Sequence, residues 1–257
     1  MQACFEKSSF TCRLVLWYHS FKGLKFGTEG RENMAARIVH HAAAERLLKC
    51  VEFKNPDRFR FGIIMPDSAG WSSEESKKAH FLKLICSGTK KTYDLTAFRS
   101  RFGRKVMTDD LYLGYYLHLV QDLLFRGFIY GKYNWDPHTD GNIDRLHDDY
   151  RKANTYLLKR HGLTFNIVLP ENLNAEELSH IAEFKPREFL AEMYSDYKQN
   201  SGDLTKESPA FFFTGEMADE FIEIAVDGCL NELNALQKGV SAINETLLAF
   251  AWKHIEK

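Results

Sequence analysis

The feature that most constrains this chain is one long apolar segment with polar residues inside it. The run DDLYLGYYLHLVQDLLF, residues 109–125, places apolar side chains on most sides of a helical cylinder. Thr108 is a favourable N-cap, and the two aspartates that open the run lie in the first turn, where the helix dipole favours negative charge. We therefore expect a buried helix around which the other elements pack.

Two polar residues, His118 and Asp122, interrupt this apolar helix. They are four residues apart and so lie on the same helical face. A buried carboxylate is costly unless its charge is compensated. A metal ion would compensate it, because histidine and aspartate form a good ligand pair. A structural His–Asp hydrogen bond inside the core would also explain the pair, so the choice depends on whether other histidines and aspartates occur in suitable settings.

The overall composition indicates a globular, mainly helical protein. Of the 257 residues, 44% are hydrophobic and 14% aromatic, and prolines and glycines number only six and sixteen. The formal net charge is −1, so nothing in the composition indicates nucleic acid or an anionic membrane as a partner. No apolar run approaches the length of a transmembrane span. The fold expected is all-α.

The cysteines indicate a reducing compartment. They are odd in number, scattered and without a C-x-x-C pair, which argues against a disulfide framework and against a thiolate zinc site; they are Cys4, Cys12, Cys50, Cys86 and Cys229. The apolar part of residues 14–18 is too short for the core of a signal peptide. We expect a soluble, cytoplasmic protein.

The domain organisation expected is an extension followed by one helical domain. Residues 1–33 show little pattern and are interpreted as an N-terminal extension outside the core, with a clean helix opening at Met34. Residues 34–257 are then a single multi-helix domain. Residues 88–93 indicate a basic turn, and 163–170 is a β-like stretch or an extended connector. Helices are expected at 34–48, 94–103, 109–125, 142–161, 174–184, 186–197, 214–238 and 241–255.

Three further residues are candidates to join His118 and Asp122. His40 lies near the apolar stripe of the first helix, and His80 stands where a charged loop meets an apolar segment. Asp67 follows Pro66 at a restrained corner after an apolar run. Each also has an ordinary interpretation, as a partly buried histidine or a capping aspartate.

The five residues together suit a transition metal. Mixed imidazole and carboxylate ligands favour zinc, iron, manganese or nickel over calcium and magnesium. A catalytic zinc takes three protein ligands and a water. Five candidates therefore indicate either one ion with more ligands, or two ions bridged by a carboxylate. Two ions roughly 3.5–4 Å apart are typical of phosphoester hydrolysis.

The motifs that carry these residues resemble a known family. The order G-x-x-x-P-D at 62–67, H-F at 80–81 and G-Y-x-x-H-x-x-x-D at 114–122 is similar to the zinc-dependent phospholipase C family, most closely to its short, unsecreted bacterial branch of hydrolases. The segment ARIVH at 36–40 resembles the start of that branch, which supports Met34 as the beginning of the domain. The branch also has a tyrosine and an asparagine on the following helix, where this chain has Tyr150 and Asn154.

The resemblance implies an all-α fold with zinc bound between helices. Its implied metal ligands are His40, Asp67, His80, His118 and Asp122. The chain departs from the secreted phospholipases C in two respects. They use the mature N-terminal amine as a ligand, which an internal start at Met34 does not reproduce, and no histidine after Asp122 is followed four residues later by a glutamate. The resemblance therefore does not carry over a full three-metal site or an activity on phospholipid.

The function expected is metal-dependent hydrolysis of a small phosphoester by a metal-activated water, with one or two ions. Metal binding lowers the pKa of a water and polarises the phosphoryl oxygen. Asp67 is the candidate catalytic residue, as a ligand or as the general base for the attacking water. Tyr115, one turn before His118, is better explained as a packing aromatic.

Two other classes of protein stay open on the sequence. An HD-type phosphohydrolase is also all-helical with histidine and aspartate ligands, and His147-Asp148 forms the required dipeptide. That alternative rests on whether this pair is buried, and a structure that places His147 in the same cavity as His118 would favour it. The second class is a non-catalytic helical protein that only binds a metal, for which we expect binding without turnover.

Overall fold

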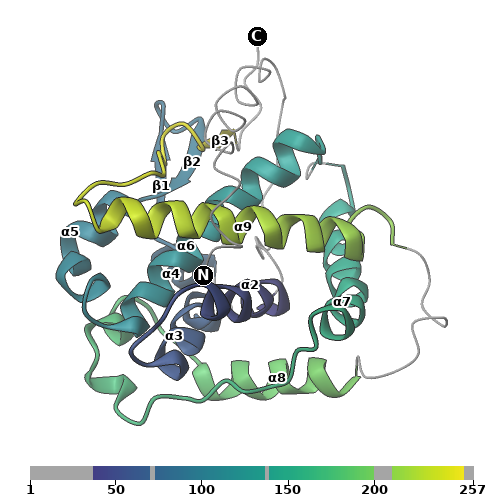
Figure 1. The fold of residues 1–257 in the computed structure, drawn as a ribbon. Coiled ribbons are helices and arrows are strands. Elements are labelled where there is room, and N and C mark those ends of the chain that lie inside the picture. The colour runs from purple at the N-terminus through teal and green to yellow at the C-terminus, as the bar shows by residue number, and fades with distance from the viewer. Residues whose placement is uncertain (1–36, 70–72, 137–138, 200–209, 252–257) are drawn as a thin grey trace.

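The computed structural model describes residues 37–69, 73–136, 139–199 and 210–251, and the fold is all-α as expected (Figure 1). The predicted extension 1–33 and the start at Met34 lie outside the described residues. The helices are α2 (Arg37–Cys50), α3 (Pro56–Gly62), α4 (Ser73–Ala79), α5 (Leu95–Val106), α6 (Asp110–Arg126), α7 (Asn142–His161), α8 (Pro186–Gln199) and α9 (Gly215–Leu236). Shorter helical turns are η2 (Met65–Ser68), η3 (Gly127–Lys132), η4 (Leu173–Ala175) and η5 (Glu177–His180).

Helix α6 is the centre of the molecule. It packs against α3, α5 and α9, while α2 packs against α9 and α7. Figure 1 shows α9 running across the molecule, with the small sheet above it and α2 and α3 below it. Every residue from 114 to 126 is buried, so the helix is enclosed on all sides, as its all-round apolar pattern predicts.

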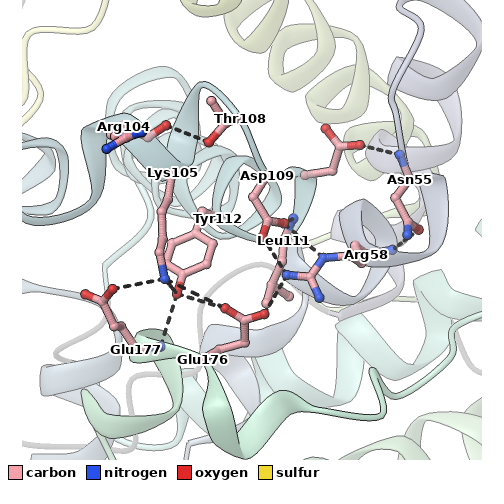
Figure 2. Close-up of polar contacts among 11 residues, drawn as sticks. Asn55, Arg58, Arg104, Lys105, Thr108, Asp109, Leu111, Tyr112, Glu176 and Glu177 are labelled. Carbon is pink, nitrogen blue, oxygen red and sulfur yellow. Dashed lines mark hydrogen bonds and ion pairs between the residues drawn. The ribbon is translucent and has the colours of Figure 1, made fainter.

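The N-cap of α6 is Asp109 and not Thr108. The Asp109 carboxylate accepts a hydrogen bond from the Leu111 backbone N–H at 3.0 Å, whereas the Thr108 hydroxyl donates to the Arg104 carbonyl at 2.9 Å (Figure 2). The prediction was wrong by one residue because both types are good N-caps and only the backbone path decides between them.

An ion-pair network fixes the start of α6 (Figure 2). Arg58 of α3 donates to both oxygens of Asp109, at 2.9 and 2.6 Å, and also to Glu176, at 2.8 Å. Glu176 accepts a further hydrogen bond from the Tyr112 hydroxyl at 3.1 Å. These contacts join α3, the first turns of α6 and the turn at 176. Bidentate arginine pairs of this kind restrain orientation as well as position.

Helices α3 and α6 cross with their backbones in contact. A Cβ added to Gly114 would lie 2.5 Å from the Phe59 carbonyl oxygen and 2.9 Å from the Ile63 nitrogen. A Cβ on Gly62 would lie 2.2 Å from the Leu111 carbonyl oxygen. Only glycine fits at this crossing, because any side chain would have to separate the two helices.

A three-stranded antiparallel sheet was not expected from the sequence. Strands β1 (Leu82–Ile85), β2 (Lys90–Tyr93) and β3 (Phe250–Ala251) pair in the order β1-β2-β3, with Leu82 opposite Tyr93. Of the predicted basic turn at 88–93, residues 88–89 do lie in the turn of a hairpin, and residues 90–93 form its second strand. The connection contains three consecutive residues with positive φ at 86–88. Such short strands are specified by their partners more than by local pattern.

The C-terminal helix predicted at 241–255 is wrong over the residues that the structure describes. Helix α9 ends at Leu236, Gly239 in the turn after it has φ +74°, and residues 240–249 form turns and irregular structure before β3. The buried Glu232 carboxylate accepts hydrogen bonds from the backbone N–H groups of Ala242 and Ile243, at 2.7 and 3.0 Å, and so holds the chain in a turn against α9. Residues 252–255 lie outside the described residues.

The remaining predictions concern the second half of the chain. Helix α7 begins and ends where the pattern predicts, and α9 is capped by Thr214, whose hydroxyl accepts from the Met217 N–H. Residues 163–170 are an extended connector, and the predicted helix at 174–184 consists of the short turns η4 and η5. Among the described residues, no helix is both long enough and apolar enough to cross a membrane.

Candidate metal centre

The structure brings all five candidate ligands to one place. His40 comes from α2, Asp67 from the turn η2, His80 from the residue after α4, and His118 and Asp122 from α6. They form two groups, His40–His118–Asp122 and Asp67–His80–His118, and in each group the potential ligand atoms lie within 4.8 Å of one another. His118 belongs to both groups, so the two are parts of one cluster.

The spacing of the ligand atoms is compatible with a metal site. The Nε2 atom of His118 lies 3.3 Å from Asp122 Oδ2, 3.2 Å from His80 Nε2 and 3.8 Å from Asp67 Oδ1. His40 Nε2 lies 3.4 Å from Asp122 Oδ1, and His80 Nε2 lies 3.4 Å from Asp67 Oδ1. Tetrahedral zinc ligands bonded at about 2.0–2.1 Å are about 3.3 Å from one another. The two oxygens of Asp122 face different histidines, as in a carboxylate that bridges two positions.

Each of the three imidazole rings is held by an oxygen acceptor at its outer nitrogen. Because a carbonyl oxygen can only accept, the Nδ1 atom carries the hydrogen and the Nε2 lone pair points into the cluster. This is the arrangement that metal-binding histidines have in proteins. The pairs are His40 Nδ1 with Gln121 Oε1 at 2.7 Å, His80 Nδ1 with the Ser76 carbonyl at 2.8 Å, and His118 Nδ1 with the Ile63 carbonyl at 2.8 Å.

Several buried polar atoms of the cluster have no hydrogen-bond partner among the described residues. His40 Nε2 and both carboxylate oxygens of Asp122 are buried and have no hydrogen-bond partner among the described residues. The lone pairs of His80 Nε2 and His118 Nε2 face each other across 3.2 Å. Buried acceptors without donors are costly, and a metal ion between them would satisfy all of these atoms at once. The donor set could therefore hold a metal ion.

The electrostatics of the cluster keep its carboxylates ionised. Burial opposes the ionised form of Asp122, but His118 and His40 hold the pKa of this carboxyl well below its usual range. Burial likewise lowers the pKa of His118, and the neighbouring His40 lowers it further. Burial also opposes the charged form of His80, but the hydrogen bond that the protonated ring donates to Asp67 and the charge of Asp122 raise its pKa overall. Negative oxygens surrounded by imidazoles attract protons or metal ions.

Asp67 is the most accessible member of the cluster. Its side chain is 19% exposed, whereas those of His118 and Asp122 are fully buried and His80 is 4% exposed. Among the five, Asp67 is therefore the side chain nearest to solvent. The position agrees with the restrained corner after Pro66, which holds the carboxylate at the edge of the core.

Tyr115 and Gly114 support the cluster from α6. The Tyr115 hydroxyl is buried and donates to the carbonyl of Ala79 at 2.6 Å, next to His80, and its ring stacks on Phe98. Tyr115 is thus a packing residue that also fixes the peptide before His80. The close approach at Gly114 brings the end of α3 near enough for the Ile63 carbonyl to reach His118.

Sequence reasoning missed Gln121 and the two backbone carbonyls. The sequence does carry a signal for Gln121, because it is another polar residue inside the apolar helix α6. In the structure its amide also donates to the Cys229 sulfur at 3.7 Å. No sequence signal identifies the carbonyls of Ile63 and Ser76 as acceptors, because every residue has a backbone carbonyl. The same logic draws attention to Arg126, one turn after Asp122 and also buried.

The other histidines that the structure describes belong to neither ligand group. His41 belongs to a separate network, in which its ring contacts the Tyr197 hydroxyl and its Nε2 lies 2.9 Å from Asn166 Oδ1. Within the described part of the chain His147 joins neither ligand group, and Asp148 is ion-paired with Lys152 at 2.7 Å. The arrangement that would favour the HD-type alternative is therefore not found among the described residues. His138 lies outside the described residues.

No family model, no curated protein and no solved structure matches the chain. The resemblance to zinc-dependent phospholipases C rests on the sequence motifs at 62–67, 80–81 and 114–122 alone. The geometry itself establishes a buried His/Asp cluster with the spacing and donor atoms of a metal site.

Proposed function

We propose that the protein is a metal-dependent hydrolase of phosphoesters. The ion would be zinc, or another transition metal such as iron or manganese, held by His40, Asp67, His80, His118 and Asp122 in one or two positions. The observation that carries the proposal is the pair of ligand groups that share His118, with the two oxygens of Asp122 turned to different histidines. Adjacent metal positions joined by a carboxylate are typical of phosphoryl-group hydrolysis.

Each residue has a distinct role in this proposal. A bound ion supplies a water of lowered pKa and an electrophile for the phosphoryl oxygen. His118 and Asp122 hold the ligand geometry from the rigid centre of α6. Asp67, the most exposed of the five side chains, is either one of the ligands or, in place of that role, the general base that accepts the proton of the attacking water. The buried walls of α6 and α2 exclude bulk water and so strengthen these interactions.

The competing class is a protein that binds a metal without turnover. The full burial of His40, His118 and Asp122 is compatible with a purely structural metal. Asp67 separates the two classes, because a structural ion needs a complete ligand shell, whereas a catalytic ion needs an accessible side.

The test is a comparison of matched variants on phosphate esters. Wild type reconstituted with zinc, iron or manganese is assayed with a phosphomonoester and a phosphodiester. His40→Ala is compared with His41→Ala, since these neighbours on α2 are both fully buried and only His40 lies in the cluster. We expect turnover that His40→Ala abolishes and His41→Ala retains in the folded fraction. Asp67→Asn is expected to lower kcat by about 100-fold or more, the range for a lost general base. Metal-loaded wild type without turnover on either ester would contradict the proposal.

A further inference from the structure

A short strap of backbone is bonded to the turn that carries one of the candidate ligands. The strap is residues 183–185, which directly precede α8. Its Lys185 N–H donates to the Ser68 carbonyl at 2.7 Å, and the middle residue of the strap pairs with Ala69 in an antiparallel bridge. These two partners are the first two residues after Asp67. The strap therefore restrains the backbone next to this carboxylate.

The other end of the strap is bonded to α4, the helix that leads to His80. The Glu183 N–H donates to the Glu75 carboxylate at 2.6 Å. Glu75 is followed by Ser76, whose carbonyl accepts the hydrogen bond from His80 Nδ1 at 2.8 Å. Hydrogen bonds to an ionised acceptor are among the stronger ones in proteins. The strap is thus held one residue away from the group that orients the His80 ring.

The middle of the strap contacts the same region through an aromatic ring. The Phe184 and Tyr115 rings meet edge to face, with their centres 6.5 Å apart and an angle of 86° between their planes. The Tyr115 hydroxyl donates at 2.6 Å to the carbonyl of Ala79, the residue before His80. All three strap residues therefore contact neighbours of Asp67 or of His80.

These two ligands belong to one of the two ligand groups. Asp67 and His80 occur only in the group that they form with His118, whereas His40 and Asp122 occur only in the other group. The two come from separate elements, η2 and the end of α4, and Asp67 Oδ1 lies 3.4 Å from His80 Nε2. Their spacing therefore depends on what holds the two elements together. Residues that orient metal ligands from outside typically affect metal affinity 10- to 100-fold.

We propose that the strap 183–185, held by Glu75, positions Asp67 and His80 as a pair for the metal ion. The inference rests on the proposed function and goes further by giving a role to residues outside the ligand set. Glu75 is a positioning residue: its carboxylate fixes the strap to α4, while Lys185 fixes it to η2. A ligand pair that is already correctly spaced binds an ion more tightly than one that must first be ordered.

Helix α4 offers a matched control in Glu74. Glu74 accepts from Lys77 at 2.9 Å, and Glu75 accepts from Lys78 at 2.6 Å, so each forms the same i,i+3 ion pair. Among the described contacts, only that of Glu75 reaches the strap. Glu75→Gln is a second control, because its amide oxygen still accepts the Glu183 N–H although the charge is lost. Both controls remove one negative charge from α4.

The experiment measures zinc affinity of the full chain by competition with a chromophoric chelator. We expect Glu75→Ala to lower zinc affinity about tenfold, whereas Glu74→Ala and Glu75→Gln stay within about twofold of wild type. Glu75 is partly exposed, so these variants are expected to fold, which circular dichroism checks. In an Asp67→Asn background, Glu75→Ala is expected to have a smaller effect, because one of the two positioned ligands is already altered.

The possible outcomes separate this inference from the proposed function. Wild type that binds no zinc, a Glu75→Ala protein with wild-type zinc affinity, an equal loss in Glu74→Ala, or an effect of Glu75→Ala that is the same with and without Asp67→Asn would each overturn the inference. Turnover of phosphoesters by a protein whose zinc affinity does not depend on Glu75 would overturn it while leaving the hydrolase standing. Zinc affinity that depends on Glu75, without turnover of either ester, would retain the strap and refute the hydrolase.

Discussion

At the level of single residues, the arrangement of the cluster depends on what holds each imidazole ring from outside. The three Nδ1–H groups each meet an oxygen at 2.7–2.8 Å, and this fixes both the tautomer and the direction of Nε2. Two of these oxygens are backbone carbonyls, which mutation does not remove. The third belongs to Gln121, whose side chain can be changed.

Gln121→Leu is expected to weaken metal binding about 10- to 100-fold, because it leaves the Nδ1–H of His40 without its acceptor and frees the ring to turn. The measurement is competition with a chromophoric chelator. Asn166→Leu is the control, since it removes the acceptor of the neighbouring His41 outside the cluster. An equal loss of metal affinity in both variants would show that Gln121 has no specific role.

The sequence identifies the five clustered side chains because each is a polar residue that interrupts or borders an apolar run. Asp122, for example, is a carboxylate on a buried helix, where its side chain has no contact with solvent. The arrangement of the five could not be predicted. Which oxygen of Asp122 faces which histidine, and which carbonyl meets His118, follows from how separate segments pack, and backbone acceptors leave no trace in the sequence.

At the level of elements, the contact of α3 with α6 determines where His118 is held. The two helices approach closely because Gly62 and Gly114 have no side chains, and the carbonyl of Ile63 follows directly after α3. The sequence predicted α6 and α7 because their patterns are long and periodic. It did not predict the hairpin β1–β2, because four-residue strands depend on their pairing more than on pattern.

Gly114→Ala is expected to destabilise the protein by about 1–3 kcal/mol, since the new methyl group would overlap the Phe59 carbonyl and force α3 away from α6. The same displacement is expected to weaken metal binding through Ile63 and His118. Gly103→Ala in α5 is the control: a Cβ there meets nothing within 4 Å. It is expected to stabilise by about 0.5–1 kcal/mol, through helix propensity. Urea denaturation measures both, and a Gly114→Ala protein as stable as wild type would contradict the close crossing.

A pH dependence is expected where α2 meets α3. Burial opposes ionisation of Glu45, but hydrogen bonds from His41, Arg60 and Asn166 lower its pKa from the usual 4.5 to about 2. A carboxyl whose pKa is lower in the folded state stabilises the fold above pH 4.5, and this contribution is lost as the pH falls towards 2.

Glu45→Gln removes this titration. The difference in free energy of unfolding between wild type and Glu45→Gln is therefore expected to be largest above pH 4.5 and to shrink at lower pH. Urea denaturation over this range measures it. A difference that does not change with pH would mean that the Glu45 pKa is not lowered by folding.

At the level of the whole molecule, the cluster exists only when four separate segments are packed together. Its ligands come from α2, η2, the end of α4 and α6, spread over residues 40–122. The unfolded chain does not present these ligands together, so a bound metal ion stabilises the folded state. The all-α class could be predicted from composition and periodicity, but the packing that joins these segments could not.

Metal is therefore expected to raise the thermal midpoint of unfolding. Free ion at about 100 times its Kd adds about 2.7 kcal/mol to folding stability. The measurement is a thermal scan of wild type and His118→Ala, each with zinc and with a chelator. Wild type is expected to show a shift that His118→Ala lacks. A shift of the same size in both proteins would place the stabilising ion elsewhere.

The most direct test of the central claim is the metal content of the purified protein. Elemental analysis is made on wild type, His118→Ala and Asp122→Asn, after reconstitution and removal of loosely bound ions. Asp122→Asn keeps the shape of the side chain and removes its charge. The account predicts one or two transition-metal ions per chain in wild type and a loss of metal in both variants. Wild type without stoichiometric metal, or variants that retain it, would contradict the account and leave the cluster as a buried structural group.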